Sequence, residues 1–90
     1  MFRLWAKEMQ NGKIIRHMTV EDASSDSRTK KVFHALTTVC REFDLEEPIW
    51  LDKNVKEFRQ YGKCRFLQDN FVETIPFEFL EMEIIEEDEA

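Results

Sequence analysis

Hydrophobic and polar side chains alternate along residues 2–9 and again along residues 14–21, on either side of Gln10-Asn11-Gly12. Alternation with a period of two around an Asn-Gly pair predicts a β-hairpin. A two-residue Asn-Gly turn would place Lys7 opposite Arg16 and mix apolar and charged side chains on both faces. We therefore expect a three-residue loop with Gly12 in the left-handed conformation. The expected pairs are Phe2 with Val20, Leu4 with Met18 and Glu8 with Ile14.

The two faces of this hairpin differ in composition. Arg16 shares the apolar face, and we expect its stem to lie at the edge of the core with its charged head in water. The other residues expected on the core face are Phe2, Leu4, Ala6, Met18 and Val20. The residues expected on the opposite, outer face are Arg3, Trp5, Lys7, Lys13, Ile15, His17 and Thr19.

The next pattern has the spacing of a helix. Residues 22–27 are rich in Asp and Ser, which are typical of a loop and a helix cap. Apolar residues then recur at intervals of three and four over about 16 residues, which predicts an amphipathic helix with one buried stripe. The stripe consists of Val32, Phe33, Leu36, Val39, Cys40 and Phe43.

The middle of the chain has a weaker pattern. Residues 49–51 follow Pro48 and favour a brief strand or extended segment, after which Asp52 can cap a second helix over about residues 53–61. Gly62 is expected to end this helix. Residues 63–76 are consistent with short strands or with a packed loop. The inward-facing candidates of the second helix are Val55, Phe58 and Tyr61.

Period-two alternation returns over residues 78–84 and predicts a final strand. The inward side chains are Leu80, Met82 and Ile84, and the outward ones are Phe79, Glu81, Glu83 and Ile85. The predicted fold is α+β: an antiparallel sheet, from the N-terminal hairpin plus the C-terminal strand, packed on one face by a long amphipathic helix, with a second short helix. We expect residues 1–90 to form a single compact domain, with residues 86–90 as an acidic frayed tail.

Composition and charge add limits to this fold. The chain has 90 residues, 42% of them hydrophobic, which is enough for one core and too few for a second. The formal charge of −6 comes from 19 acids and 13 bases, but seven of the acids lie in residues 78–90. The rest of the chain is almost neutral. The net charge therefore does not identify a partner.

Features of export and membrane insertion are missing from the pattern. The apolar runs are far shorter than the roughly 20 residues of a membrane-spanning helix, and Arg3 and Lys7 interrupt the N-terminal segment. Cys40 and Cys64 lie 24 positions apart without the spacing of a zinc site, so we expect buried, reduced thiols, with a disulfide as the less favoured alternative. A cytoplasmic protein without a membrane partner is the expectation.

Four segments carry a resemblance to a known group of proteins. They are Arg3-Leu4-Trp5-Ala6-Lys7, Pro48-Ile49-Trp50-Leu51-Asp52-Lys53-Asn54, Gln68-Asp69-Asn70-Phe71 and Phe79-Leu80-Glu81. Together they are similar to a family of small bacterial proteins of about this length, to which no activity is attached. The resemblance spans most of the chain. It implies a bacterial, cytoplasmic setting and assigns no residue roles.

No pattern of catalytic residues stands out. His17 and His34 belong to different predicted elements and have no Ser, Cys or second His at a telling distance. Asp52, Asp69 and Glu73 lack the spacing of a metal-binding loop. Two glycines cannot supply a phosphate-binding loop. We therefore predict no catalytic, cofactor-binding or metal-binding residues, and we favour a protein that is not an enzyme.

A basic segment offers one candidate surface. Five cations fall within 13 residues and are interleaved with Phe58, Tyr61 and Phe66, which could stack on nucleic-acid bases. The acidic chain and the interruption of the run by Glu57 argue against this reading. Nucleic-acid contact stays the less favoured alternative. The five cations are Lys53, Lys56, Arg59, Lys63 and Arg65.

The outer face of the sheet offers the favoured surface. If the last strand lies beside the first, Glu81 and Glu83 meet Arg3 and Lys7, and apolar side chains gather around Trp5. The predicted protein interface consists of Trp5, Ile15, His17, Phe79 and Ile85. The sequence thus predicts a small protein-interaction module, homodimeric through this face or bound to another protein.

Overall fold

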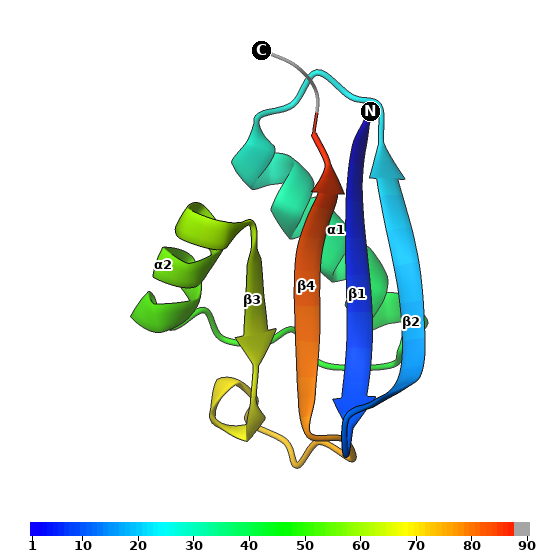
Figure 1. Cartoon of the computed structure of the whole chain (residues 1–90), viewed down its shortest axis with the longest axis vertical. Helices are drawn as coiled ribbons and strands as arrows, with labels where there is room; N and C mark the ends of the chain where they lie inside the picture. Colours follow the sequence, from blue (N-terminus) through cyan, green and yellow to red (C-terminus); the bar gives the residue numbers. More distant parts are fainter. Residues whose placement is uncertain (88–90) are drawn as a thin grey trace.

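The structure, a computed structural model, describes residues 1–87. Its elements are β1 (Phe2–Gln10), β2 (Lys13–Asp22), α1 (Arg28–Glu42), α2 (Asp52–Tyr61), β3 (Lys63–Phe66), the 3₁₀ turn η1 (Gln68–Asn70) and β4 (Phe79–Glu86). The strands form one antiparallel sheet in the order β2-β1-β4-β3 (Figure 1). The fold is α+β, with a four-stranded sheet and two α-helices in the part of the chain described.

The turn of the hairpin differs from the prediction. Gln10 pairs with Lys13, so the loop has two residues, and both Asn11 (φ 52°) and Gly12 (φ 75°) are left-handed. Positive φ at both positions is what a tight hairpin turn requires, and Asn-Gly tolerates it best. The predicted left-handed Gly12 is present, but the predicted three-residue loop is wrong.

A β-bulge explains why the predicted faces hold despite the wrong loop. Met9 pairs with Ile14 and Glu8 with Arg16, which leaves Ile15 as an extra residue on β2. The extra residue shifts the register, so that Leu4 pairs with Val20 rather than with Met18. All three predicted pairs are therefore wrong. The bulge restores the alternation of inward and outward side chains that a two-residue turn alone would have lost.

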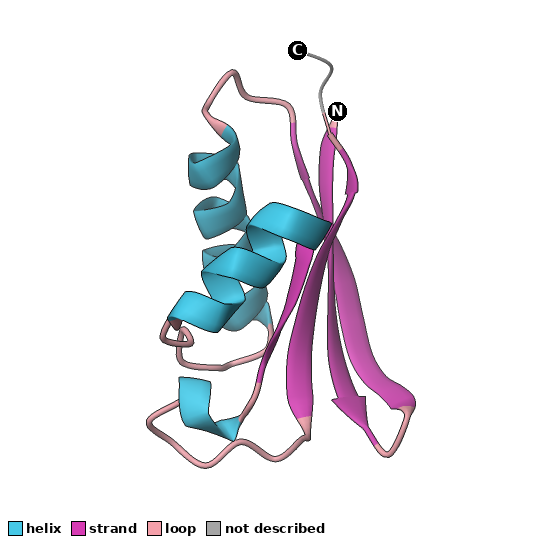
Figure 2. Ribbon diagram, turned by 60° about the vertical axis from the view of Figure 1, so that its left-hand side comes forward, coloured by secondary structure: helices cyan, strands magenta, loops and turns pink. Residues whose placement is uncertain are grey.

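The core lies between the sheet and the helices. Figure 2 shows both helices on one side of the sheet, and no helix of residues 1–87 lies on the other side. Met18, Val20 and Ile84 are partly buried against this core. Its buried side chains include Phe2, Leu4 and Ala6 of β1, Val32, Ala35, Leu36, Val39 and Cys40 of α1, and Leu80 and Met82 of β4.

Glu8 is a buried acid on the inner face of β1, with 3% of its surface exposed. Arg16 donates to its carboxylate from Nε (3.0 Å) and from Nη2 (2.8 Å), and Nη2 also donates to the carbonyl oxygen of Phe43 (2.9 Å). The Arg16 side chain is 45% exposed, so its head reaches water as expected, but the ion pair with Glu8 was not predicted from the sequence. A buried carboxylate is costly without a partner, and Arg16 supplies one.

Helix α1 spans 15 residues and begins where Ser27 Oγ accepts a hydrogen bond from the backbone N–H of Lys30 at 3.3 Å. Five of the six predicted stripe residues are buried. The exception is Phe33, which is 48% exposed, and Ala35 is buried instead.

Helix α2 begins one residue earlier than predicted. Asp52 is its first residue rather than its cap, and Leu51 holds the cap position. Phe58 is buried, whereas Tyr61 is 64% exposed and does not face inward. Gly62 ends the helix in the left-handed conformation, as predicted.

Two turns with the same hydrogen bonds organise the middle of the chain. In the first, the backbone N–H of Leu51 donates to Asn54 Oδ1 (3.1 Å) and that of Asn54 donates to the Leu51 carbonyl (2.9 Å). In the second, Leu67 and Asn70 make the same pair of bonds at 3.0 and 2.9 Å. Residues 49–51 belong to no strand, and Leu51 has an extended backbone (φ −94°, ψ 160°), which agrees with the second of the two expected alternatives, an extended segment.

The two asparagines also bind each other. Asn70 Nδ2 donates to Asn54 Oδ1 (2.7 Å) and to the carbonyl of Ile49 (2.7 Å), and Asn54 Nδ2 donates to the carbonyl of Arg65 (2.8 Å). Both side chains have 0% exposure. Because every polar atom of the pair has a partner, burial costs little, and the pair ties α2, β3 and η1 together. We call Asn54 and Asn70 the asparagine pair.

Residues 63–76 combine both predicted alternatives: residues 63–66 form β3, and most of the remainder is loop. Strand β4 continues through Glu86, two residues past its predicted end, so the tail predicted for residues 86–90 begins inside a strand. The Glu87 side chain pairs with Arg28 at 3.0 Å. Residues 88–90 of that tail lie outside the described residues. No helix among the described residues is long and apolar enough to cross a membrane.

Candidate functional site

The outer face of the sheet carries a network of charges. Lys7 of β1 lies opposite Glu81 of β4, and its Nζ is 2.9 Å from the Glu81 carboxylate and 3.8 Å from that of Glu83. Arg65 of β3 reaches Glu81 from the other side at 3.4 Å. The side chains of Lys7 and Glu81 are only 11% and 13% exposed, so the centre of this network is shielded from solvent.

Burial and charge act in opposite directions on Glu81. Burial alone would raise the pKa of its carboxyl group, but hydrogen bonds and positive charge from Lys7 and Arg65 outweigh burial and hold the pKa below its ordinary value. Glu81 therefore stays ionised through the neutral range and keeps both cations in place.

Trp5 lies at the centre of the outer face. Its Nε1 donates to His17 Nδ1 across the hairpin at 3.0 Å, and the two rings meet edge-on with centroids 5.9 Å apart. The Lys7 ammonium lies 4.0 Å from the centre of the indole ring, a cation–π distance. Trp5 is therefore held half-buried by polar neighbours.

The predicted interface residues are only partly brought together. Trp5 and His17 are in contact, but Phe79 pairs with Met9, about 13 Å along the strand from the level of Trp5. Phe79 lies under the Arg65 guanidinium, 4.5 Å from its ring centre. Ile85 lies near the opposite end of β4. Ile15 and Ile85 are 52% and 49% exposed. Because Phe79 and Ile85 lie near opposite ends of β4, the predicted apolar residues do not all gather around Trp5.

Arg3 has different partners from those predicted. The register places it opposite Glu86 and Glu21, and its Nε lies 3.5 and 3.7 Å from their carboxylates. The predicted contacts of Lys7 with Glu81 and Glu83 are present, whereas those of Arg3 with the same two acids are not. A second bulge in β4, between Leu4 and Arg3 of its partner strand, shifts the register and brings Glu86 opposite Arg3.

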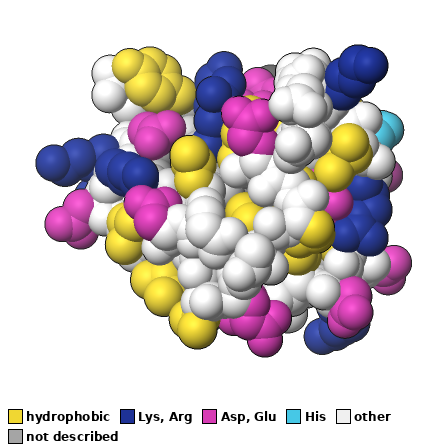
Figure 3. All heavy atoms as spheres, turned by 90° about the horizontal axis from the view of Figure 1, so that it is seen from below, with side chains coloured by type: hydrophobic (Ala, Val, Ile, Leu, Met, Phe, Trp, Pro, Cys, Tyr) yellow, Lys and Arg dark blue, Asp and Glu magenta, His cyan; other side chains and the backbone are white. Residues whose placement is uncertain are grey.

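The basic segment is divided by the fold. Lys53 pairs with Asp69 and Arg65 with Glu81, both at 3.4 Å. Of the interleaved aromatics, Phe58 and Phe66 are buried in the core, so only Tyr61 is open to a nucleic-acid base. Figure 3 shows the molecule from below, where cations and acids are interspersed and no surface of a single sign is formed.

The other chemically active residues do not converge. His34 lies on an exposed part of α1, 3.9 Å from Asp26. No group of three or more His, Cys, Asp or Glu among residues 1–87 could hold a metal ion. Cys40 and Cys64 are free and buried, as expected. Burial, with a smaller effect of nearby acids, raises the pKa of both thiols to about 12, so neither is a nucleophile at neutral pH.

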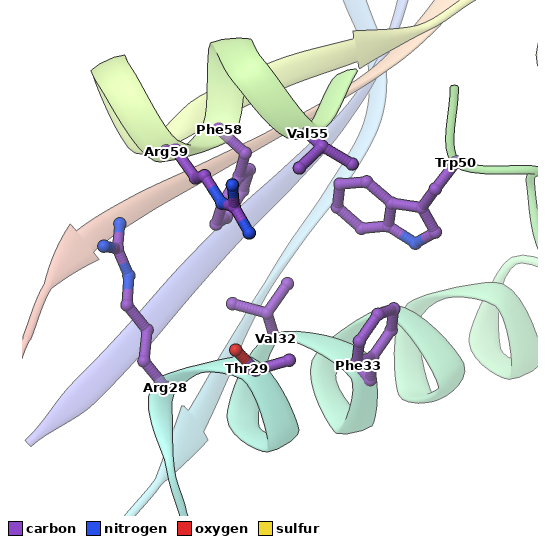
Figure 4. Close-up of a pocket in the computed structure, with 8 residues that line it drawn as sticks. All are labelled: Arg28, Thr29, Val32, Phe33, Trp50, Val55, Phe58 and Arg59. Carbon is purple, nitrogen blue, oxygen red and sulfur yellow. The ribbon is translucent and has the colours of Figure 1, made fainter. Parts of the chain in front are cut away.

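A groove between α1 and α2 was not predicted from the sequence. It has a volume of about 450 Å³ and is open to solvent on one side. Figure 4 shows apolar side chains at one end and two arginines at the other. The residue that could have indicated this groove from the sequence is Phe33, which lies at the margin of the apolar stripe of α1. The lining residues are Arg28, Thr29, Val32, Phe33, Trp50, Val55, Phe58 and Arg59.

Trp50 forms the apolar wall of this groove. Its ring meets Phe33, Phe58 and Phe66 edge-on, with centroids 5.7, 5.9 and 5.0 Å away. Its Nε1 is buried without a hydrogen-bond partner in the described part of the chain. Trp50 stands next to Ile49, whose backbone the asparagine pair holds.

Comparison with protein-family models, with curated proteins and with solved structures finds no match to this chain.

Proposed function

We propose that this protein is a small, non-catalytic interaction module, and that the outer face of its sheet binds a second copy of the chain. The observation that carries the proposal is Trp5, an aromatic side chain held in a fixed orientation by His17 and Lys7 on a sheet face without a helix. Tryptophan and arginine are enriched at the centres of protein interfaces. In this proposal, α1 uses its apolar stripe to cover the inner face and leaves the outer face to the partner.

The charges favour self-association. Cations and carboxylates lie side by side on the outer face, as with Lys7 between Glu81 and Glu83 and Arg3 between Glu21 and Glu86. A two-fold axis places such a face against its own copy, and a face with both signs can then match cations with acids. Exposed Ile15 and Ile85 add apolar area at the rim of this contact.

The oligomeric state tests the proposal. Size-exclusion chromatography with light scattering is expected to give a mass that rises toward twice that of one chain as the concentration reaches high micromolar values. Trp5→Ala is expected to shift this rise to at least tenfold higher concentration, because it removes the central side chain. Tyr61→Ala, at an exposed aromatic on α2, is the matched control and should change nothing. A wild-type mass of one chain at every concentration would contradict the proposal.

The alternative is a nucleic-acid-binding or regulatory role for the basic segment. What supports it is that Lys56, Arg59 and Lys63 are exposed and make no ion pair within residues 1–87. Retention of RNA or DNA by the protein on a filter at low salt, lost on the triple change to Gln, would favour this alternative. No retention at low salt would dismiss it.

A further inference from the structure

The groove between α1 and α2 has two chemically different ends. At the apolar end, Phe33 of α1, Trp50 of the connecting loop and Val55 of α2 face one another (Figure 4). Phe33 is 48% exposed although it lies on a helix that buries most of its large apolar residues. An exposed aromatic wall beside a buried core is typical of a binding groove, and a volume of about 450 Å³ falls in the range of small-molecule sites.

The other end is cationic. Arg28, at the start of α1, and Arg59, near the end of α2, both line the groove, and Figure 4 shows both guanidinium groups at the end away from Trp50. Arg59 makes no ion pair with any described residue. Arg28 pairs through Nε with the carboxylate of Glu87 at 3.0 Å. A carboxylate is therefore already bound at this end, next to a second arginine that has none.

We propose that this groove binds a small amphiphilic carboxylate, with its anionic head at Arg28 and Arg59 and its hydrocarbon part against Phe33, Trp50 and Val55. The two guanidinium groups select an anionic head group, because they favour an anion that can accept paired hydrogen bonds. The aromatic end selects an apolar tail. Glu87 competes for Arg28, so the chain's own acid limits the affinity. This site is independent of the outer face and of any dimer that forms there.

The test uses octanoate as the probe, with octan-1-ol as the neutral probe of the same chain length. Two-dimensional ¹H–¹⁵N NMR spectra of the full chain are recorded during each titration. Octanoate is expected to shift the indole N–H signal of Trp50 saturably, with a dissociation constant in the low-millimolar range or tighter, and to leave that of Trp5 in place. Octan-1-ol is expected to bind at least fivefold more weakly.

Three variants locate the head group. Arg59→Gln is expected to weaken octanoate at least fivefold, because it removes the unpaired cation. Arg41→Gln, at an exposed arginine of α1 outside the groove, is the matched control and should leave the affinity unchanged. Glu87→Gln is expected to strengthen binding about twofold to threefold, because it frees Arg28 from a carboxylate.

Several results would overturn the proposal. They are the absence of a saturable shift at Trp50, equal binding of octanoate and octan-1-ol, or an Arg59→Gln variant that binds as tightly as the wild type. Saturation of the groove by an acidic peptide but not by octanoate would also overturn it and would assign the groove to a protein partner. Spectra of the free variants are recorded first, and only variants with the dispersed signals of a folded protein are titrated, so a lost shift reports the groove.

Discussion

The two tryptophans of this chain stand in contrasting environments. Trp5 is held by polar side chains, with its N–H on His17 and Lys7 over its ring. Trp50 is held by three aromatic rings, and its own N–H has no partner in residues 1–87. The contrast teaches that the two sides of this sheet are stabilised differently. Aromatic packing and the hydrogen bonds of the asparagine pair stabilise the helix side, whereas ion pairs stabilise the outer face.

The two sides of the sheet are stabilised differently because the helix side excludes water and the rim of the outer face does not. On the helix side, a buried polar atom without a partner costs about 1 to 3 kcal/mol. The asparagine pair satisfies the buried polar groups of its own two turns, whereas Trp50 Nε1 has no partner among residues 1–87. At the rim of the outer face, water and salt compete with the ion pairs of Arg3, so each pair contributes little to folding, whereas the Lys7–Glu81 pair at the centre is shielded from solvent. Ion pairs that contribute little to folding can be rearranged when a partner binds. This supports the outer face as the site of association.

The largest effect is expected at the asparagine pair. Asn70→Ala removes two donated hydrogen bonds and one accepted bond. It takes these partners from the Ile49 carbonyl and the Leu67 N–H, and it leaves Asn54 Oδ1 with only the bond from the Leu51 N–H. We expect a loss of about 3 kcal/mol in the free energy of unfolding, measured by urea denaturation. Gln60→Ala, at an exposed position of α2, should change it by less than about 0.5 kcal/mol. Equal effects of the two substitutions would show that the asparagine pair does not stabilise the fold.

A smaller and pH-dependent effect is expected for Glu81→Gln. Because the pKa of Glu81 is depressed in the folded protein, its contribution is fully present above the ordinary pKa and is lost as the pH falls through the folded-state value. We expect a loss of about 1 kcal/mol at pH 7 that fades below about pH 4. The measurement is urea denaturation of both proteins from pH 7 to pH 3. A difference that does not depend on pH would mean that charge is not the cause.

The smallest effect is expected at the rim of the outer face. Arg3→Gln removes contacts of 3.5 and 3.7 Å between side chains that are about half exposed. We expect a change in stability below about 0.5 kcal/mol, which disappears in 1 M salt. Thermal unfolding at low and high salt measures it. A loss as large as that of Glu81→Gln would show that the rim is as shielded as the centre of the network.

The period-two and helical patterns predicted the strands β1, β2 and β4 and the helix α1, because each element places a regular apolar stripe against the core. They also predicted the contact of Lys7 with Glu81 and Glu83. The loop and register of the hairpin could not be predicted this way. A two-residue turn plus a bulge at Ile15 gives the same inward set as a three-residue loop, so the pattern does not distinguish them.

The middle of the chain was less predictable for a different reason. Its order comes from hydrogen bonds between turns far apart in sequence, and a hydrophobic pattern contains no record of them. The repeated spacing of Leu51 with Asn54 and Leu67 with Asn70 was visible, but its meaning depends on the two side chains meeting in space. The groove was missed because Phe33 reads as one more member of the α1 stripe until α2 is placed beside it.

The indole N–H signals of the two tryptophans give the most direct test of the outer face as the site of association. A dilution series of the wild-type protein, from about 1 mM to 20 µM, is followed by ¹H–¹⁵N NMR, with Trp5→Phe used to assign the signals. We expect the Trp5 signal to move with concentration, because the partner copy covers it, and the Trp50 signal to stay fixed. A Trp5 signal that stays fixed over the whole range, or a Trp50 signal that moves in its place, would contradict the account.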